Sequence, residues 1–214
     1  MKTNSRRGQA AFTLIELMAV ITIIVILAGL VVGGMGFVSE RQAKEKAKVQ
    51  IALLSKALEE YKLDMGTYPP TYTTATGAGQ TVDSLYTALF FEGYDYASKT
   101  VPPSPSTWTK KIGTVDFPKA TRIYLPDLDP TSSKQGWMSA SFAGKANPPD
   151  PKKDEPNSTK IFDPWGKEYA YRTATNPSGT ANSNTQNPDF DLWSYGKDGV
   201  NDPVNKVKDD IRNF

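Results

Sequence analysis

The most continuous apolar pattern in the chain lies near its amino terminus. Residues 12–32 have the sequence FTLIELMAVITIIVILAGLVV and hold a single ionisable side chain, Glu16. At ~1.5 Å of rise per residue, these 21 residues form a helix about 31 Å long, close to the ~30 Å hydrocarbon core of a bilayer. The pattern therefore predicts a membrane-spanning helix, since few soluble folds can enclose so long an apolar run.

The apolar periodicity continues beyond this segment and becomes one-sided. Spacings of three and four residues predict an amphipathic helix, whose apolar stripe comprises Ala43, Ala47, Ile51, Leu54, Leu58, Tyr61 and Met65. Gly66, Pro69 and Pro70 supply stop signals directly after it. We therefore expect one helix over residues 12–65, with lipid or other subunits around its first half and a folded head packed on its second half.

The rest of the chain predicts a small mixed head. Apolar positions over residues 82–90 follow helical spacing, and Gly93 ends this short helix. Aromatic and β-branched residues predict three strands, at 121–125, 168–172 and 190–194. Polar stretches at 141–160 and 173–188 predict surface loops. The fold class is therefore α+β: a long amino-terminal helix, transmembrane in its first half, whose second half packs on a small antiparallel β-sheet head.

Three glycines, Gly33, Gly34 and Gly36, interrupt the predicted helix between its two halves. Each costs a helix ~1 kcal/mol relative to alanine. We therefore hypothesise that this stretch bends or melts when subunits pack into an assembly.

Composition removes several classes of function. The 214 residues include no cysteine and no histidine, which excludes disulfides, thiolate metal sites and His-dependent catalysis. Ser, Lys and carboxylates remain, but no spacing singles out a catalytic set, so we do not expect an enzyme. Residues 1–11 carry Lys2, Arg6 and Arg7 and no acid, whereas the remainder carries 22 basic and 23 acidic side chains. The balance gives no reason to expect nucleic-acid binding, and the basic start predicts a cytoplasmic amino terminus.

Two plainer interpretations of the amino-terminal segment compete with an assembly helix. A secretory signal peptide usually has an apolar region of ~7–15 residues followed by small residues, whereas here the run is longer and Gly8, Ala10 and Ala11 precede it. A plain anchor for a monomeric ligand-binding head is the other alternative. Such an anchor gains nothing from Glu16, because a carboxylate in lipid costs at least about 2.5 kcal/mol.

Glu16 therefore needs a partner, and the apolar segment contains no Lys or Arg to supply one. Cleavage between Ala11 and Phe12 would create a free α-amino group one helical turn away. That positive group can pair with Glu16 of the same chain or with Glu16 of a neighbouring chain.

The basic leader, the small residue and the sequence FTLIEL resemble the processing motif of type IV pilins and type II secretion pseudopilins. The resemblance implies that a prepilin peptidase cleaves after Ala11 and methylates Phe12, and that Glu16 aligns an incoming subunit in a growing filament. Ala11 stands where the family usually has glycine. The implied domains are a cleaved leader, a transmembrane and assembly helix, its amphipathic continuation, and a pilin-like head, at 1–11, 12–38, 39–66 and 67–214, with a variable insertion at 71–160.

The carboxyl-terminal part holds the candidate ligand site. Residues 163–166 (DPWG) predict a structural turn, and together with FDLWSYGKDG at 190–199 they resemble paired segments of the major pseudopilin of type II secretion. Six oxygen-bearing side chains then follow within 13 residues: Asp198, Asn201, Asp202, Asn205, Asp209 and Asp210. Calcium takes six to eight oxygen ligands and tolerates irregular loops. The alternative is an ordinary loop whose Asp and Asn side chains form their own turns.

The resemblance implies that this loop, residues 195–211, binds calcium. The implied ligands are the side chains of Asp198, Asp209 and Asp210 and the backbone carbonyl of Tyr195. Asp202 is either an additional ligand or a sign that the geometry has diverged. The lack of cysteine gives a metal a physical role, because no disulfide can close this tail.

The function that the resemblance implies is structural. The subunit polymerises into a type II secretion pseudopilus that drives protein export across the outer membrane, the alternative being a type IV pilus for adhesion, twitching motility or DNA uptake. The implied partners are further copies in a helical filament, minor pseudopilins, the prepilin peptidase, the inner-membrane assembly platform and lipid before assembly. The implied location is a single pass through the inner membrane, with the head in the periplasm or on an extracellular filament.

Overall fold

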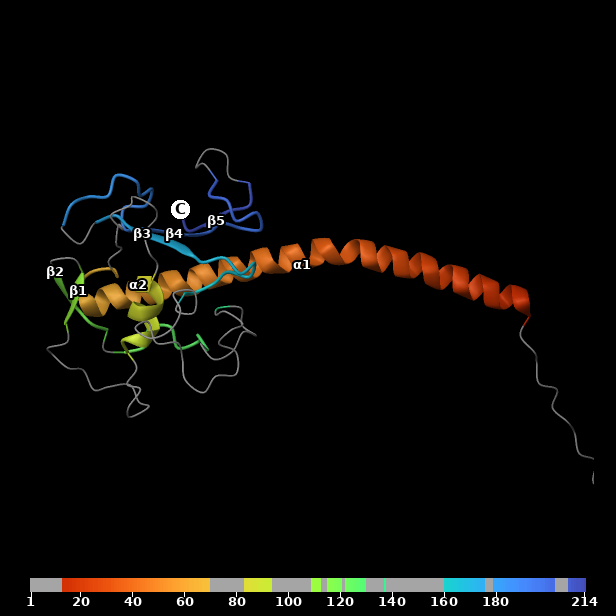
Figure 1. Cartoon of the computed structure of the whole chain (residues 1–214), viewed down its shortest axis with the longest axis horizontal. Helices are drawn as coiled ribbons and strands as arrows, with labels where there is room; N and C mark the ends of the chain where they lie inside the picture. Colours follow the sequence, from red (N-terminus) through yellow and green to blue (C-terminus); the bar gives the residue numbers. More distant parts are fainter. Residues whose placement is uncertain are drawn as a thin grey trace, which may run out of the picture. The chain divides into compact units, whose positions relative to one another are not determined.

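Figure 1 shows the computed structural model of the chain. The structure describes residues 13–69, 83–93, 109–112, 115–120, 122–129, 137, 160–175, 179–202 and 208–214. Its elements, in chain order, are α1 (Leu14–Met65), α2 (Asp83–Tyr86), the π-helix η1 (Thr87–Phe91), β1 (Thr109–Ile112), β2 (Val115–Pro118), β3 (Ala170–Thr173), β4 (Phe190–Ser194) and β5 (Ile211–Arg212). The chain divides into two compact units, residues 1–42 and 43–214, with the boundary inside α1.

The described part of the first unit is the amino-terminal portion of α1. The large apolar side chains that the structure describes between Leu14 and Val38 each expose between 51% and 82% of their surface. Within the described ranges, α1 is the one helix that is long and apolar enough to cross a bilayer. Contiguous apolar surface of this kind needs lipid or another protein to cover it. Gly33 and Gly36 are helical in this single chain, so the predicted bending on assembly stays a prediction.

The carboxyl-terminal portion of α1 supplies the core of the second unit. Most of the predicted stripe is buried, with Ala47, Ile51, Leu54, Leu58 and Tyr61 between 0% and 5% exposed. Ala43 and Met65, at the two ends of the stripe, are partly exposed. The helical periodicity of the sequence therefore predicted correctly which face of α1 packs into the head.

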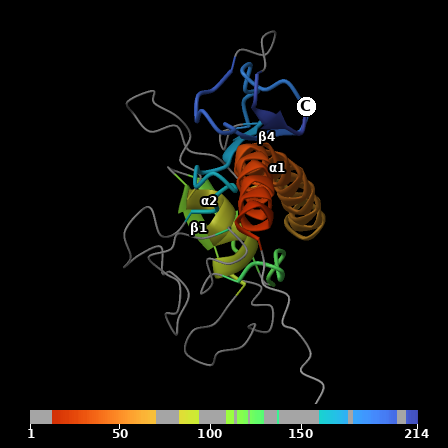
Figure 2. The same ribbon diagram turned by 90° about the vertical axis from the view of Figure 1, so that its right-hand side faces the viewer.

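A three-stranded antiparallel sheet in the order β3-β4-β5 packs against this portion of α1. Tyr171 pairs with Leu192 across β3 and β4, and Trp193 pairs with Arg212 across β4 and β5. Phe190 and Leu192 join the helix in one apolar cluster, whereas the side chains of alternate residues on β4 point to the other face. Figure 2, which looks along α1, shows β4 and α2 on different sides of the helix.

The predicted helix over 82–90 consists of α2 followed by η1, whose Leu89 and Phe90 are buried. Gly93 follows it, and a Cβ added there would lie 2.2 Å from the backbone carbon of Arg122. Glycine is therefore required at this position by the close approach of another backbone segment.

The predicted strand at 121–125 is wrong for its described residues, 122–125, which belong to no sheet. The backbone N–H groups of Tyr124 and Leu125 instead both donate to the carbonyl of Leu89, at 2.8 and 3.2 Å. The apolar side chains of this irregular segment pack in the core, while its backbone hydrogen bonds go to η1 rather than to a neighbouring strand. Tyr124 packs edge-to-face on Tyr61, with ring centroids 5.3 Å apart.

The other two predicted strands are confirmed. β4 has the predicted bounds, and β3 covers Ala170–Thr173 rather than 168–172 because Glu168 forms only an isolated bridge with Phe162. The hairpin of β1 and β2 and the two-residue β5 were not predicted. In the loop predicted at 173–188, the described residues outside β3 include an isolated bridge between Thr175 and Ala181. The loop predicted at 141–160 lies outside the described residues, apart from Lys160.

Candidate functional site

The amino-terminal end of α1 is closed by a capping box formed by Thr13 and Glu16. The backbone N–H and the hydroxyl of Thr13 donate to Glu16 Oε2 at 2.9 and 2.8 Å, and the Glu16 N–H donates to Thr13 Oγ1 at 3.3 Å. This reciprocal arrangement satisfies backbone donors that the first turn of a helix leaves unpaired. Thr and Glu three residues apart are its sequence signature, which the sequence analysis did not use.

The capping box gives Glu16 partners within its own chain. Ala11 and Phe12, the predicted processing residues, lie outside the described residues. The pairing predicted between Glu16 and a new α-amino group therefore stays a prediction.

Three of the predicted loop carboxylates come together at the carboxyl terminus. One ligand oxygen from each of Asp202, Asp209 and Asp210 can be chosen so that all three lie within 4.8 Å of one another. Asp202 and Asp210 are buried, and Asp209 is partly buried. Asp202, whose part the sequence left open, is thus a member of the group.

Close approach of backbone segments brings these residues together. Gly196 has φ = +64°, and a Cβ added there would lie 2.5 Å from the Asp209 carbonyl oxygen, so only glycine fits. The Asp198 N–H donates to Asp209 Oδ2 at 3.0 Å, while Asp198 Oδ1 accepts from the N–H of Val200 at 2.8 Å. Asp198 is exposed, and its carboxylate is outside the group of three. It forms its own turn, as the alternative interpretation of the loop predicted for such residues.

The oxygens of the acidic group differ in their partners. Asp202 Oδ2 accepts from the N–H groups of Lys208 and Asp209 at 2.7 and 3.3 Å. Asp210 Oδ2 accepts from the N–H of Asp202 at 3.0 Å and from Arg212 Nη2 at 2.6 Å. Asp209 Oδ1 and Asp210 Oδ1 are buried and have no hydrogen-bond partner among the residues that the structure describes. Two carboxylate oxygens without partners in one acidic cluster suit a cation, so these residues fit calcium.

The same environment acts on the protonation of two of these acids. Burial raises the pKa of Asp210, and the hydrogen bond from Arg212 offsets part of that effect. The hydrogen bond from the Lys208 backbone N–H lowers the pKa of Asp202. Carboxylates this close repel one another unless a nearby positive charge compensates them. Arg212 supplies one such charge through its ion pair with Asp210.

The DPWG turn at residues 163–166 is connected by hydrogen bonds to the start of the acidic loop. Asp163 Oδ1 accepts from the N–H groups of Trp165 and Lys167 at 3.0 and 2.8 Å, and Gly166 has φ = +78°. The hydroxyl of Ser194 donates to Asp163 Oδ2 at 2.5 Å and accepts from the N–H of Gly196 at 3.0 Å. Asp163 is therefore a structural residue that fixes the start of the loop, as the turn interpretation predicted.

Comparison with known proteins shows which class of protein the chain is similar to. A family model of the prokaryotic N-terminal methylation motif matches residues 6–32, at the start of the long apolar helix. A second model, type II secretion system protein G, matches residues 37–105. In this motif, the long amino-terminal helix and the small antiparallel sheet, the chain is similar to type IV pilin-like proteins.

The chain is also similar to proteins named type II secretion system core protein G. It is 46% identical to that of Aeromonas hydrophila over 66 residues, which are 31% of this chain and 46% of the relative. It is 37% identical to that of Escherichia coli K12 over 109 residues, 51% of this chain and 61% of the relative. For Dickeya chrysanthemi the values are 43% over 76 residues, 36% and 48%. The chain thus spans about half of the length of these relatives, and both family-model matches end before the acidic loop.

Proposed function

We propose that this chain is a structural subunit that polymerises into the pseudopilus of a type II secretion system. The observation that carries the proposal is an N-methylation motif at the start of a helix whose described large apolar side chains from Leu14 to Val38 are exposed. Similarity to core protein G favours the pseudopilus over a type IV pilus. In this proposal the first unit crosses the inner membrane with its basic end in the cytoplasm, and the head formed by the second unit lies in the periplasm.

Assembly moves the apolar helix from lipid to a bundle of neighbouring helices. The prepilin peptidase cleaves after Ala11 and methylates Phe12, and the assembly platform adds each subunit to further copies and to minor pseudopilins. In a single subunit Glu16 is held by Thr13 of the same chain. In the filament, the new amino group of an adjoining subunit neutralises Glu16, which removes an unpaired charge from an apolar environment.

The capping box allows the two possible roles of Glu16 to be separated. Glu16→Gln retains an oxygen that accepts from Thr13 but carries no charge, whereas Thr13→Ala removes the two hydrogen bonds of the Thr13 hydroxyl and retains the charge. We expect Glu16→Gln to abolish filaments recovered from cells that carry the secretion machinery, and Thr13→Ala to leave them. Mass spectrometry should find an N-methylated Phe12 terminus in both variants.

Filaments of normal yield from Glu16→Gln would overturn the proposed charge pairing. A mature protein that still begins at Met1 would overturn the assembly proposal itself. Loss of filaments in Thr13→Ala alone would show that Glu16 acts only as a helix cap.

We also propose that the acidic loop holds a calcium ion. Asp202, Asp209 and Asp210 are the side chains that support it, because their oxygens converge and two of them lack partners. Asp198 and the carbonyl of Tyr195 remain ligands implied by the resemblance alone. The ion would supply a positive charge that joins the segments on either side of residues 203–207, as a disulfide does in other exported proteins.

The calcium proposal is tested by titrating the chelated full-length protein, in detergent micelles, with calcium. We expect one saturable site and a higher Tm with calcium, because a ligand at 100 times its Kd stabilises a fold by about 2.7 kcal/mol. Asp209→Asn should weaken binding strongly, and Asp127→Asn, which alters an exposed acid outside the loop, should not. A melting curve that neither EDTA nor calcium moves would overturn this proposal.

A further inference from the structure

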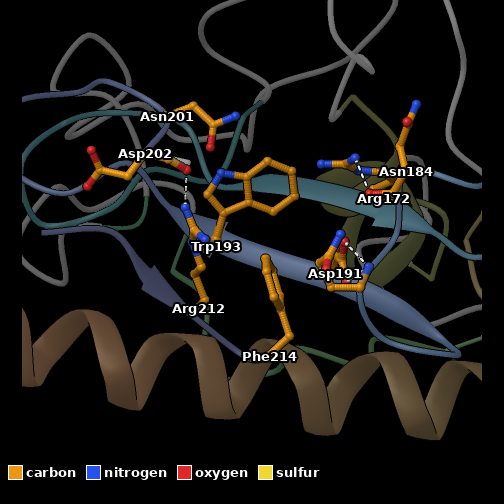
Figure 3. A pocket seen from close by; sticks show the side chains of 9 residues that line it. Arg172, Asn184, Asp191, Trp193, Asn201, Asp202, Arg212 and Phe214 are labelled. Atoms are coloured by element: carbon orange, nitrogen blue, oxygen red, sulfur yellow. Dashed lines mark hydrogen bonds between the residues drawn. The ribbon is translucent and has the colours of Figure 1, made fainter. Parts of the chain in front are cut away.

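A positive side chain from β5 contacts the acidic group formed by Asp202, Asp209 and Asp210. Arg212 Nη2 donates to Asp210 Oδ2 at 2.6 Å and to the carbonyl of Asp202. Figure 3, which views the small cavity that Arg212 also lines, marks the second of these hydrogen bonds with a dashed line. Arg212 therefore joins the residues on either side of 203–207, the same two segments that the proposed calcium ion would join.

The ion pair of Arg212 is shielded from water. The side chains of Arg212 and Asp210 are 7% and 0% exposed, and the guanidinium carbon lies 5.4 Å from the centre of the Phe214 ring, a cation–π contact that restrains it. Lys208 lowers the pKa of Asp202 through its backbone N–H and, less strongly, through its charge, but its side chain is exposed. Because solvent screens exposed charges more than buried ones, Arg212 acts more strongly on an ion held by this group.

The charge of the group follows from its members. At neutral pH, three carboxylates and one guanidinium carry a formal charge of −2, whereas the carboxylates alone would carry −3. Arg212 also leaves oxygens open, because Asp209 Oδ1 and Asp210 Oδ1 have no hydrogen-bond partner in the part of the chain that the structure describes. The number of charged ligands tunes the affinity of oxygen sites for cations. With Arg212 present, one divalent cation balances the group.

We propose that Arg212 sets the charge of the acidic loop to match a divalent cation. This inference rests on the proposed calcium site and adds the residue that determines its preference for ion charge. A guanidinium has no acceptor, so Arg212 acts through its charge and not as a ligand. Its repulsion of a bound ion grows in proportion to the charge of that ion. A trivalent ion therefore loses more affinity to Arg212 than calcium does.

The test compares the affinities of the full-length chain for Ca²⁺ and for Tb³⁺, a trivalent ion of similar size that also prefers oxygen ligands. The protein, in detergent micelles, is stripped of metal with EDTA, the chelator is removed, and the Kd of each ion is measured by calorimetry at constant pH and ionic strength. The ratio of the two Kd values is the readout. A change in loop shape that weakens both ions alike leaves this ratio unchanged.

Three variants separate charge from geometry. Arg212→Gln removes the charge but keeps an N–H donor for Asp210, and it should shift the ratio in favour of Tb³⁺ by about tenfold. Arg212→Lys keeps the charge and should keep the ratio of the natural chain, even where its different geometry weakens both ions. Arg122→Gln is the matched control, because Arg122 also pairs with a carboxylate, that of Asp64 at 2.8 Å, outside the acidic loop. It should leave both Kd values unchanged.

Removal of the arginine charge leaves Asp210 buried without its positive partner, which can prevent folding. Arg212→His covers that case, because a histidine is charged at about pH 5.5 and largely neutral at about pH 8. The natural chain contains no histidine and serves as the control for every other pH effect on the two ions. Between these pH values, the preference of Arg212→His for Tb³⁺ should rise by more than that of the natural chain.

The outcomes distinguish this inference from the calcium proposal beneath it. A ratio in Arg212→Gln equal to that of the natural chain, or the same pH dependence of the ratio in Arg212→His as in the natural chain, would overturn the inference and leave calcium binding in place. A ratio that changes as much in Arg212→Lys as in Arg212→Gln would overturn it too, because the shape of Arg212 rather than its charge would then be responsible. A natural chain without a saturable calcium site would overturn the calcium proposal, and this inference with it.

Discussion

The two compact units of the chain solve the problem of apolar surface in opposite ways. In the first, apolar side chains cover most of the helix and remain exposed, while the Glu16 carboxylate is satisfied within a single turn by Thr13. In the second, one stripe of the same helix is buried by η1 and the sheet. The first unit therefore depends on its surroundings for stability, and the second depends on its own packing.

The largest effect expected from this difference is on the buried stripe. Leu58 is fully buried, so Leu58→Ala should lower the free energy of unfolding of the head by about 2–5 kcal/mol. Leu63→Ala is the control on the same helix, since Leu63 is 84% exposed. Ile24→Ala is the control in the first unit, where Ile24 is also exposed. Both controls should change the stability of the head by less than about 0.5 kcal/mol in chemical denaturation.

A loss of head stability in Ile24→Ala as large as that in Leu58→Ala would contradict the division. It would mean that the first unit contributes to the packing of the head rather than waiting for partners.

Within the second unit, the sequence predicted some elements correctly and missed others. Regular periodicity located the buried stripe of α1, because burial of one helix face imposes that periodicity, and aromatic and β-branched residues located β4. It failed at 122–125, where Tyr124 and Leu125 are apolar for the core but their backbone bonds go to Leu89. Contacts between segments distant in sequence leave no local pattern from which to predict them.

The acidic loop shows the same limit within one site. Composition correctly pointed to a cluster of acids, and the turn at 163–166 was predicted from its own residues. Which acids converge depends on contacts between separate segments, such as the close approach of Gly196 to Asp209, and the Asp198 carboxylate lies outside the group.

A second effect, of intermediate size, concerns the buried acid of the head. Asp163→Ala removes the acceptor for two backbone N–H groups and Ser194, and should cost about 1–3 kcal/mol. Asp163→Asn keeps one acceptor oxygen for those N–H groups and should cost less at neutral pH.

The pH dependence gives this prediction its sign. Burial raises the pKa of Asp163 above its usual value, despite hydrogen bonds that favour the charged form. The folded state therefore holds the proton more tightly than the unfolded state, and the stabilisation is present below the unfolded pKa of ~3.9 and lost as pH rises through the folded pKa. Denaturation of the natural chain and Asp163→Asn across this range should show that component only in the natural chain. Parallel pH profiles would contradict it.

The smallest effect concerns the ion pair between Lys62 at the end of α1 and Asp189 before β4. Lys62 Nζ lies 3.0 Å from Asp189 Oδ1, with both side chains about half exposed, and it also contacts the hydroxyl of Tyr68. An exposed pair of this kind contributes about 0.2–1 kcal/mol, so a double-mutant cycle of Lys62→Met and Asp189→Asn should return a coupling in that range. The coupling should shrink at about 1 M salt, where the screening length is ~3 Å. A coupling that persists in high salt would show that it comes from packing of Lys62 against the Tyr68 ring rather than from the ion pair.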